Sequence, residues 1–152
     1  MDLKTYLPYL VNRVGQRMVA EITPVLSECG VDVQMWRALI ALYQQGDQPM
    51  GALADLTSIN VSTLSRLIGR MAGRGLVERV RGSDDARSVI IHLTADGRAV
   101  TEAILPRASA LEEEATADFS DAEIAMLRQL LVKLYAGLEG GSAVEEDERL
   151  AG

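Results

Sequence analysis

The sequence is poor in the residues that build redox, metal or nucleophilic sites. Its 152 residues include one cysteine, Cys29, and one histidine, His92. A single cysteine excludes an internal disulfide framework and suits a reducing cytoplasm. One cysteine and one histidine also leave no cluster for zinc and no Ser–His or Cys–His pair for nucleophilic catalysis. We therefore expect a cytoplasmic protein that is not an enzyme and needs no metal or other cofactor.

Long apolar runs and aromatic residues are also scarce. No stretch approaches the ~20 consecutive apolar residues that a membrane-spanning helix needs. No basic segment leads into an apolar one at the N-terminus, so no signal peptide is evident. Aromatic residues make up 4% of the chain and hydrophobic residues 48%. Because Leu, Ala, Val and Met dominate, the composition favours helices in one domain with a modest core and no membrane contact.

The charge is negative in total but unevenly distributed. The net charge of −7 argues at first against a nucleic-acid partner. Residues 60–87, however, contain six arginines against three acidic residues, whereas residues 111–152 are rich in acid. The local field, not the total charge, steers binding to phosphate. The charge pattern therefore allows a nucleic-acid site on residues 60–87.

A cationic amphipathic helix is predicted between Asn60 and Gly75. The side chain of Asn60 can cap its N-terminus, and Gly75 stands where a C-cap is expected. Residues at helical spacing form an apolar stripe, and arginines four residues apart share another face. The stripe comprises Val61, Leu64, Leu67, Ile68 and Met71, and the arginines are Arg66, Arg70 and Arg74. No acidic residue between Asn60 and Gly75 neutralises these arginines.

The segments around this helix predict a helix-turn-helix followed by a hairpin. A short helix over Met50–Leu56 precedes it across a three-residue gap. Two strands are predicted after it, Leu76–Arg81 and Val89–Leu93, joined by a polar loop that contains Arg87. A helix of this kind can enter a DNA major groove while the hairpin reaches the neighbouring minor groove. A solvated surface helix and hairpin would show the same run of charges. The prediction of a DNA-binding site therefore rests on the helix-turn-helix, the arginines and the hairpin together, not on charge alone.

Apolar periodicity predicts four further helices. The first covers residues 7–29, and the second covers Val33–Gln44 with Asp32 as its cap. Its inward side chains are expected to be Trp36, Leu39, Ile40 and Tyr43. The third runs from Ala95 to about Ala117 after a Thr94 cap. The fourth opens on the capping-box pattern Ser120–Glu123 and reaches about residue 138. Residues 139–152 are predicted to be an acidic mobile tail.

Two stretches carry a resemblance to a known family. LADLTSINVSTLSRLIGRMAGRGLVER, followed by SDDARSVIIHLTADGRAV, resembles the MarR family (multiple antibiotic resistance regulators) of winged helix-turn-helix transcription factors. The likeness covers about residues 3–138. It implies a mainly α fold with a small β-hairpin wing, in which a winged helix-turn-helix domain carries long N- and C-terminal dimerisation helices. We therefore expect a single domain over residues 1–138, with a DNA-reading lobe at about 32–94.

The long helices at about 7–29 and 95–138 carry more apolar surface than a small winged helix needs to cover itself. An intrachain helical bundle and a symmetric dimer would both bury these stripes. The resemblance implies the dimer. Such a dimer should read a pseudo-palindromic operator with half-sites about 34–36 Å apart.

The expected DNA-binding residues combine short hydroxyls, arginines and the hairpin loop. Arg66 could contact guanine through two hydrogen bonds, worth ~1–3 kcal/mol of discrimination. Arg70 is expected to contact phosphate, and Arg74 either caps carbonyls or pairs with an acid. The resemblance implies that Arg87 enters the minor groove and that Asp85 orients it. The whole set is Asn60, Ser62, Thr63, Ser65, Arg66, Arg70, Arg74, Asp85 and Arg87.

The resemblance further implies a small anionic, often aromatic, effector bound between the DNA-reading lobe and the dimer helices. An aromatic wall with a cation for a carboxylate would suit it. The candidates are Tyr6, Tyr9, Arg13, Trp36, Arg37 and Tyr43. Trp36 and Tyr43 also fit as core residues, because they recur at helical spacing.

These observations favour a homodimeric DNA-binding transcriptional regulator, a repressor released from its operator by the ligand. One alternative is an acidic helical protein-interaction module that never binds DNA. Another is a regulator that senses oxidants through Cys29, as one branch of the family does. That branch uses an earlier cysteine, and the negative dipole at a helix C-terminus disfavours a thiolate at Cys29.

Overall fold

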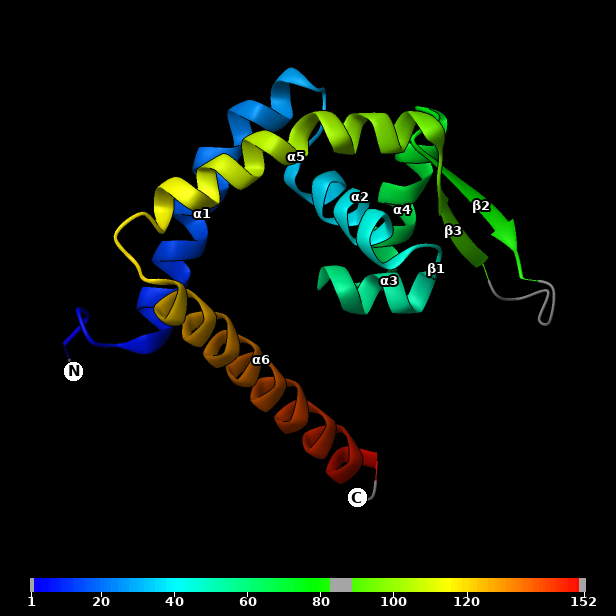
Figure 1. Cartoon of the computed structure of the whole chain (residues 1–152). Helices are drawn as coiled ribbons and strands as arrows, with labels where there is room; N and C mark the ends of the chain where they lie inside the picture. The colour runs from blue at the N-terminus through cyan, green and yellow to red at the C-terminus, as the bar shows by residue number, and fades with distance from the viewer. Residues whose placement is uncertain (1, 83–88, 151–152) are drawn as a thin grey trace. The chain divides into compact units, whose positions relative to one another are not determined.

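The computed structural model describes the backbone of residues 2–82 and 89–150. The described segments form helices and short strands, drawn in Figure 1. In chain order they are α1 (Leu7–Glu28), α2 (Val33–Gln45), β1 (Gln48–Pro49), α3 (Met50–Thr57), α4 (Val61–Gly73), β2 (Val77–Arg81), β3 (Val89–Leu93), α5 (Ala95–Ala115) and α6 (Asp121–Leu150). The predicted mainly α fold with a small β-hairpin is confirmed. None of the helices in these ranges has the length and apolar character needed to cross a membrane.

The chain divides into two compact units, Met1–Leu111 and Glu112–Gly152, with the boundary inside α5. The first unit holds α1 to α4, the three strands and most of α5. The second holds α6 and the end of α5. The single domain over residues 1–138 stays a prediction.

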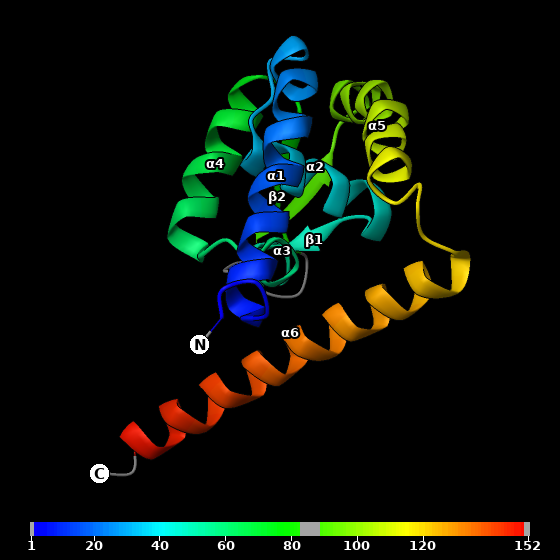
Figure 2. The same cartoon turned by 90° about the vertical axis from the view of Figure 1, so that its left-hand side faces the viewer.

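The core of the first unit lies where α2, α3 and α4 meet the sheet (Figures 1 and 2). The apolar stripe of α4 is buried as predicted at Leu64, Leu67, Ile68 and Met71. Val61 is an exception, because it lies in the first turn and its side chain is 53% exposed. The prediction of which α2 residues face inward is wrong except at Leu39, because the buried face is rotated by about one residue from the expected one. Its buried residues are Met35, Ala38, Leu39 and Leu42, whereas Trp36, Ile40 and Tyr43 are only half-buried.

The predicted caps at the helix N-termini are confirmed. The backbone N–H of Met35 donates to Asp32 Oδ1 at 2.8 Å, which begins α2. In the same way, the N–H of Thr63 donates to Asn60 Oδ1 at 2.8 Å and begins α4. Each bond satisfies a donor that the first helical turn leaves without a partner. The sequence therefore placed the start of the recognition-helix candidate correctly.

The end of α4 explains a difference at the predicted first strand. Gly75 has a φ of +73°, and the N–H of Leu76 donates to the Met71 carbonyl at 3.0 Å. The N–H of Gly75 donates to the Ala72 carbonyl at 2.9 Å, which completes a Schellman motif. Leu76 thus closes the helix, and β2 begins one residue later, at Val77.

The sheet is antiparallel with the strand order β1-β3-β2. In the hairpin, Val77 pairs with Leu93 and Arg81 pairs with Val89. β1 was not predicted, since its two residues include Pro49 and stand in a stretch that reads as a helix break. It pairs through Gln48 with Ile91 in the centre of β3. This pairing ties the base of the hairpin to the start of α3.

The start of α5 is packed tightly against the end of α4. The hydroxyl of Thr94 donates to the Gly75 carbonyl at 2.6 Å and accepts the N–H of Gly97 at 3.0 Å, so the predicted Thr94 cap is confirmed. A Cβ added at Gly97 would lie 2.0 Å from the Leu76 carbonyl oxygen. Only glycine fits so close an approach. This junction fixes where α5 leaves the lobe.

In the second unit, α6 begins at the predicted capping box. The backbone N–H of Ser120 donates to Glu123 Oε2 at 2.8 Å, and the N–H of Glu123 donates to the Ser120 hydroxyl at 3.3 Å. The bond from the Ser120 N–H lowers the pKa of Glu123. The helix continues past residue 138 to Leu150, where we expected none. Ala, Glu, Leu and Arg within residues 143–150 are good helix formers, whereas Gly140 and Gly141 before them are poor ones. The mobility of this acidic segment stays a prediction.

Candidate nucleic-acid interface

The first turn of α4 is organised by its cap. The Ser62 hydroxyl donates to Asn60 Oδ1 at 2.9 Å, and the same oxygen receives the Thr63 N–H. Both Asn60 and Ser62 are exposed, so this polar turn faces solvent beside the short helix α3. It presents fixed hydroxyl and amide groups of the kind that meet base edges or phosphates.

Arg66 lies one turn further along the exposed face of α4. It is opposite the buried residues Leu64 and Ile68, and it makes no hydrogen bond or ion pair with any described residue. Its guanidinium is therefore a cation that the described part of the fold does not use. An arginine in this state can give both donors of its fork to a guanine edge or a phosphate.

Arg70 and Arg74 are instead tied to the turn between α1 and α2. Arg70 Nη2 lies 3.5 Å from Asp32 Oδ2, with both side chains largely exposed. Arg74 Nη1 donates to the Gly30 carbonyl at 2.6 Å and approaches Met35 Sδ at 3.6 Å. Of the two alternatives for Arg74, the structure thus shows a carbonyl contact, at the end of α1. The DNA contacts expected of both arginines stay predictions.

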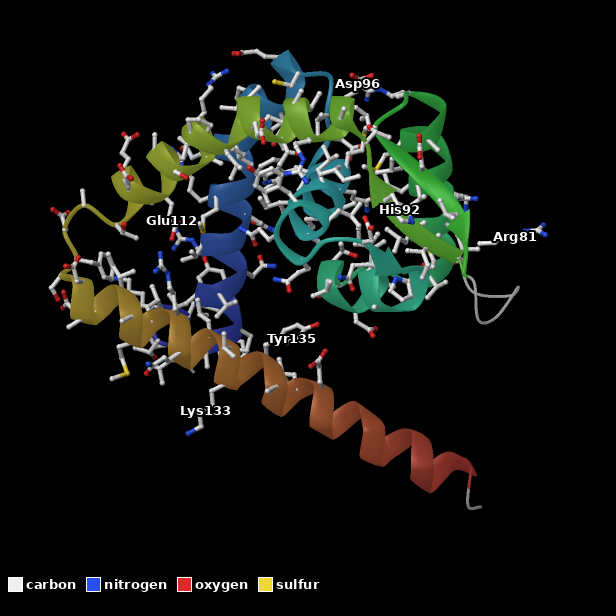
Figure 3. The ribbon with its side chains drawn as sticks, turned by 45° about the vertical axis from the view of Figure 1, so that its right-hand side comes forward. Arg81, His92, Asp96, Glu112, Lys133 and Tyr135 are labelled. Atoms are coloured by element: carbon white, nitrogen blue, oxygen red, sulfur yellow. The ribbon has the colours of Figure 1, made fainter. Side chains whose placement is uncertain are left out.

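Two arginines on β2 were missing from the expected set. Arg79 donates from Nη2 to the carbonyl of Ser65 in α4. Arg81 extends from β2 into solvent, away from the helices of the lobe (Figure 3). Residues two apart on a strand share a face, so Arg79 and Arg81 lie on one side of the hairpin. That alternation was visible in the sequence and could have identified them.

The tip of the hairpin carries the remaining predicted residues. Asp85 and Arg87 lie outside the described residues, so their expected contact stays a prediction. The last described pair of the hairpin is Arg81 with Val89.

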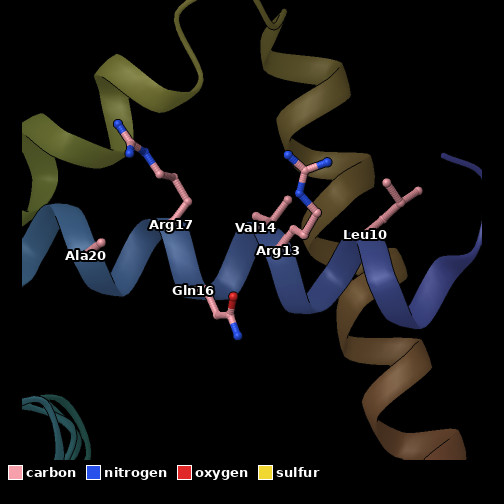
Figure 4. Close-up of a pocket in the computed structure, with 6 residues that line it drawn as sticks. All are labelled: Leu10, Arg13, Val14, Gln16, Arg17 and Ala20. Carbon is pink, nitrogen blue, oxygen red and sulfur yellow. The ribbon is translucent and has the colours of Figure 1, made fainter. Parts of the chain in front are cut away.

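Of the six effector candidates, Tyr9 and Arg13 lie on α1 and Tyr6 directly precedes it. The guanidinium of Arg13 stands over the ring of Tyr9, 5.5 Å from its centroid. Arg13 also lines an open groove of about 530 Å³ along one side of α1, with Leu10, Val14, Gln16, Arg17 and Ala20 (Figure 4). Tyr6 precedes the helix and is 40% exposed. This groove combines a cation with apolar side chains.

The other three candidates lie on α2, in different surroundings. The Tyr43 hydroxyl donates to Glu102 at 3.3 Å, and Arg98 stands 5.1 Å from its ring centroid. Trp36 packs half-buried against the core. Arg37 lines a groove of about 400 Å³ with residues of α2, α3 and the turn after it: Ile40, Ala41, Gln44, Gln45, Leu56, Thr57 and Ser58. The six candidates are therefore not brought together, and their effector role stays a prediction.

One ion pair joins α5 to the end of α1. Arg107 donates from both terminal nitrogens to the Glu28 carboxylate, with the Nη2–Oε1 distance at 3.3 Å. These hydrogen bonds, with the attraction of the charges, hold the pKa of Glu28 below its ordinary value. The same partner raises the pKa of Arg107. The pair fixes α5 beside the α1–α2 turn that Arg74 also contacts.

The cysteine and the histidine take part in local contacts. Cys29 is half-buried as the C-cap of α1, where its N–H donates to the Leu26 carbonyl at 3.0 Å. His92 Nδ1 in β3 lies 2.9 Å from Asp47 Oδ2. Among the side chains that the structure describes, in residues 2–82 and 89–139, no three from His, Cys, Asp or Glu gather closely enough to hold a metal ion.

The described surface therefore combines a helix-turn-helix, a hairpin and cations on one exposed helix face. An α-helix fits the DNA major groove, and short hydroxyls with arginines are the usual partners of its base edges and phosphates.

Comparisons with known proteins agree with this arrangement. The sequence model of the MarR family matches residues 33–89. The uncharacterized HTH-type transcriptional regulator YsmB of Bacillus subtilis is 31% identical over 110 residues, which are 72% of this chain and 75% of that protein. Among solved structures, a mutant MarR from Escherichia coli complexed with operator DNA is 26% identical, with a TM-score of 0.76 over 84% of this chain and 92% of that one.

A third similar protein is Bordetella bronchiseptica BpsR, whose structure concerns the regulation of its DNA binding by 6-hydroxynicotinic acid. It is 27% identical, with a TM-score of 0.76 over 85% of this chain and 98% of that chain. The shared sequence and the shared fold thus lead to one assignment. The chain belongs to the MarR family of DNA-binding transcriptional regulators.

Proposed function

We propose that the protein is a homodimeric repressor of transcription that a small anionic ligand releases from its operator in the cytoplasm. The observation that carries the proposal is the exposed face of α4. There Arg66 stands without a partner among the described residues, in a protein whose net charge is −7. An exposed arginine without a protein partner stays solvated in the free protein. It is then available to bind a phosphate or a base edge when DNA approaches.

The exposed apolar surface of the long helices supports the dimer. α1 exposes large apolar side chains along its first turns, at Leu7, Leu10, Val11, Val14 and Met18. α6 does the same at Met126, Leu127, Leu130, Leu131 and Val132. Apolar stripes of this length on monomers usually mark protein–protein contacts. A second copy of the chain would bury them and present two α4 helices to a pseudo-palindromic operator with half-sites about 34–36 Å apart.

Two grooves of the first unit support a ligand. Each combines an arginine with apolar side chains, Arg13 on α1 and Arg37 between α2 and α3. A small aromatic carboxylic acid would pair its charge with the arginine and pack its ring against the apolar side chains. In the similar protein BpsR, 6-hydroxynicotinic acid, a ligand of this chemistry, regulates DNA binding. The ligand must bind the free and the DNA-bound states unequally, since equal binding shifts nothing.

The sharpest test of the DNA contact uses Arg66→Ala. Wild-type protein would first select its preferred duplex from a random pool. Arg66→Ala should then lose preference at one base position, by about 1–3 kcal/mol of discrimination, while folding normally. Lys4→Ala removes one exposed charge outside the interface and serves as the control. If Arg66→Ala weakens all duplexes by the same factor, the residue contacts phosphate and reads no base.

The hairpin tip is tested by Arg87→Ala. Because a minor-groove arginine replaces counterions, its loss should weaken binding to every duplex and lower the salt dependence by about one unit of slope. The measurement is a titration of DNA affinity against salt concentration. Unchanged affinity and slope would remove Arg87 from the interface.

A further inference from the structure

Arg79 forms a bridge between the hairpin and the middle of α4. Its Nη2 donates to the Ser65 carbonyl oxygen, across 14 residues of chain. Both residues are at the surface, and Arg79 itself is exposed. A hydrogen bond from a charged donor is stronger than one between neutral groups, so this contact holds its geometry better than a neutral one would.

The acceptor lies within the segment that should meet DNA. Ser65 directly precedes Arg66, and its carbonyl has a second lone pair beside the one used within the helix. The neighbouring position on this face is Gly69, where an added Cβ would lie 3.7 Å from Arg79 Nη2. The guanidinium therefore lies close over the helix backbone, at a place where no side chain intervenes.

The other end of the bridge is anchored in the sheet. Arg79 pairs with Ile91, which is fully buried and also pairs with Gln48 of β1. Two positions before Arg79, Val77 is buried in the core. The Cα of Arg79 is thus fixed by the central strand of the sheet. The bridge links this rigid sheet to α4, and the hairpin continues from it to Arg81.

We propose that Arg79 is a positioning residue that sets the orientation of α4 relative to the hairpin. The inference rests on the proposed DNA-binding function and adds a determinant of its specificity. Bases are read only if the helix enters one groove while the hairpin reaches the next, so the two elements need a fixed mutual orientation. Non-specific binding to phosphates tolerates a looser arrangement, because it depends on charge rather than register.

The experiment compares Arg79→Ala, Arg79→Lys and Arg81→Ala with the wild-type protein. Each binds the duplex selected by the wild type and a scrambled duplex of the same composition, over a range of salt. Arg79→Ala should lose about tenfold in affinity for the selected duplex, as expected for one charged hydrogen bond, and less than about twofold for the scrambled one. Its salt slope should match the wild type. Arg79→Lys, which keeps a charged donor, should restore most of the preference.

Arg81→Ala is the matched control on the same face of the same strand. It removes an equal charge without removing the bridge, so it should weaken both duplexes alike. If Arg79→Ala behaves as a phosphate contact, with both affinities reduced equally and a slope lower by about one, the proposal is overturned. Unaltered preference in Arg79→Ala would overturn it as well.

A measurement without DNA separates this proposal from the proposed function. Residual dipolar couplings of the α4 and β2 amides report the relative orientation of the two elements in the free protein. We expect one fixed orientation in the wild type and averaged couplings in Arg79→Ala, whether or not any duplex is bound. Identical couplings in both proteins contradict the positioning role. Failure of the wild type to prefer any duplex would count against the proposed function instead.

Discussion

The helix α4 and the long helices α1 and α6 carry the same kind of apolar stripe, but the stripe is buried in α4 and largely exposed in α1 and α6. In α4, Leu64 and Ile68 are completely buried. In α1, Val14 is 58% exposed, and in α6, Leu130 is 55% exposed. The spacing of apolar residues is helical in all three. The stripe of α4 meets α2, α3 and the sheet within its own chain, whereas much of the apolar surface of α1 and α6 has no such cover among the described residues.

This difference in burial distinguishes the lobe around α4, whose apolar stripe is covered by its own chain, from the long helices, whose stripes a partner could cover. The lobe is closed by short connections, by a glycine that admits no side chain, and by side-chain caps at the starts of α2, α4 and α5. Stripes left open cost free energy in water, at roughly 25 cal/mol per Å² of apolar surface. On our account a second copy of the chain recovers that free energy.

A core truncation should cost more than an exposed one, and its cost should not depend on protein concentration. Leu67 is 1% exposed and Leu130 is 55% exposed in the single chain. Leu67→Ala should lower the free energy of unfolding by about 2–5 kcal/mol at every concentration. Leu130→Ala should cost less, and its cost should shrink at concentrations where the dimer dissociates. Urea unfolding at two protein concentrations measures both. Equal, concentration-independent costs would contradict the contrast.

A charge in the exposed stripe of α6 should prevent dimerisation. Leu130→Glu would place a carboxylate in the proposed interface, so association of the two copies should weaken at least about 100-fold, or about 2.7 kcal/mol. Sedimentation analysis measures this change. Gln129→Glu adds the same charge at the neighbouring exposed position and should leave the dimer intact. Circular dichroism should show both variants folded. A dimeric Leu130→Glu protein would place the interface elsewhere.

A methyl group at the junction of the lobe should be costly. Gly97→Ala brings a Cβ to 2.0 Å from the Leu76 carbonyl, so the start of α5 must shift. We expect a loss of roughly 1–3 kcal/mol in the free energy of unfolding. Gly73→Ala is the control, since its Cβ would meet nothing within 4 Å. It should be neutral or slightly stabilising, because alanine is the better helix former. Thermal unfolding of the two variants compares them directly.

The smallest expected effect concerns pH and the Glu28–Arg107 pair. The folded-state pKa of Glu28 lies below its ordinary value of 4.5. The pair therefore stabilises the fold above that value, and its contribution is lost as pH falls through the lowered pKa. Wild type should be slightly more stable than Glu28→Gln at pH 7, and the difference should vanish in acid. Denaturant unfolding across pH measures the difference.

The local signals in the sequence predicted the lobe well. Asn60, Asp32 and Thr94 cap helices because their side-chain oxygens accept early amides, and this depends on few neighbours. Val89–Leu93 is the third strand with the predicted limits. β1 escaped prediction because two residues carry no periodicity. The inward face of α2 was misjudged, because which side of a broad apolar stripe is buried depends on the neighbours it meets.

The site was predicted in part, for a similar reason. Residue type and spacing identified Arg66, Arg70 and Arg74 as cations on one helix. They could not show that Arg74 would bind the Gly30 carbonyl, 44 residues away, or that Arg79 would reach Ser65. Such contacts arise only when distant segments meet. The effector candidates were grouped by chemistry, whereas the fold distributes them over different surfaces.

The central claim is that a protein of net charge −7 binds duplex DNA through the local cations of α4 and the hairpin. The most direct test is the affinity of the wild-type protein for the promoter DNA beside its own gene, titrated against salt. We expect the affinity to fall on the order of 10³-fold between 50 and 200 mM salt, with its logarithm linear in the logarithm of the salt concentration. An affinity that does not change with salt, or no binding to any duplex, would contradict it.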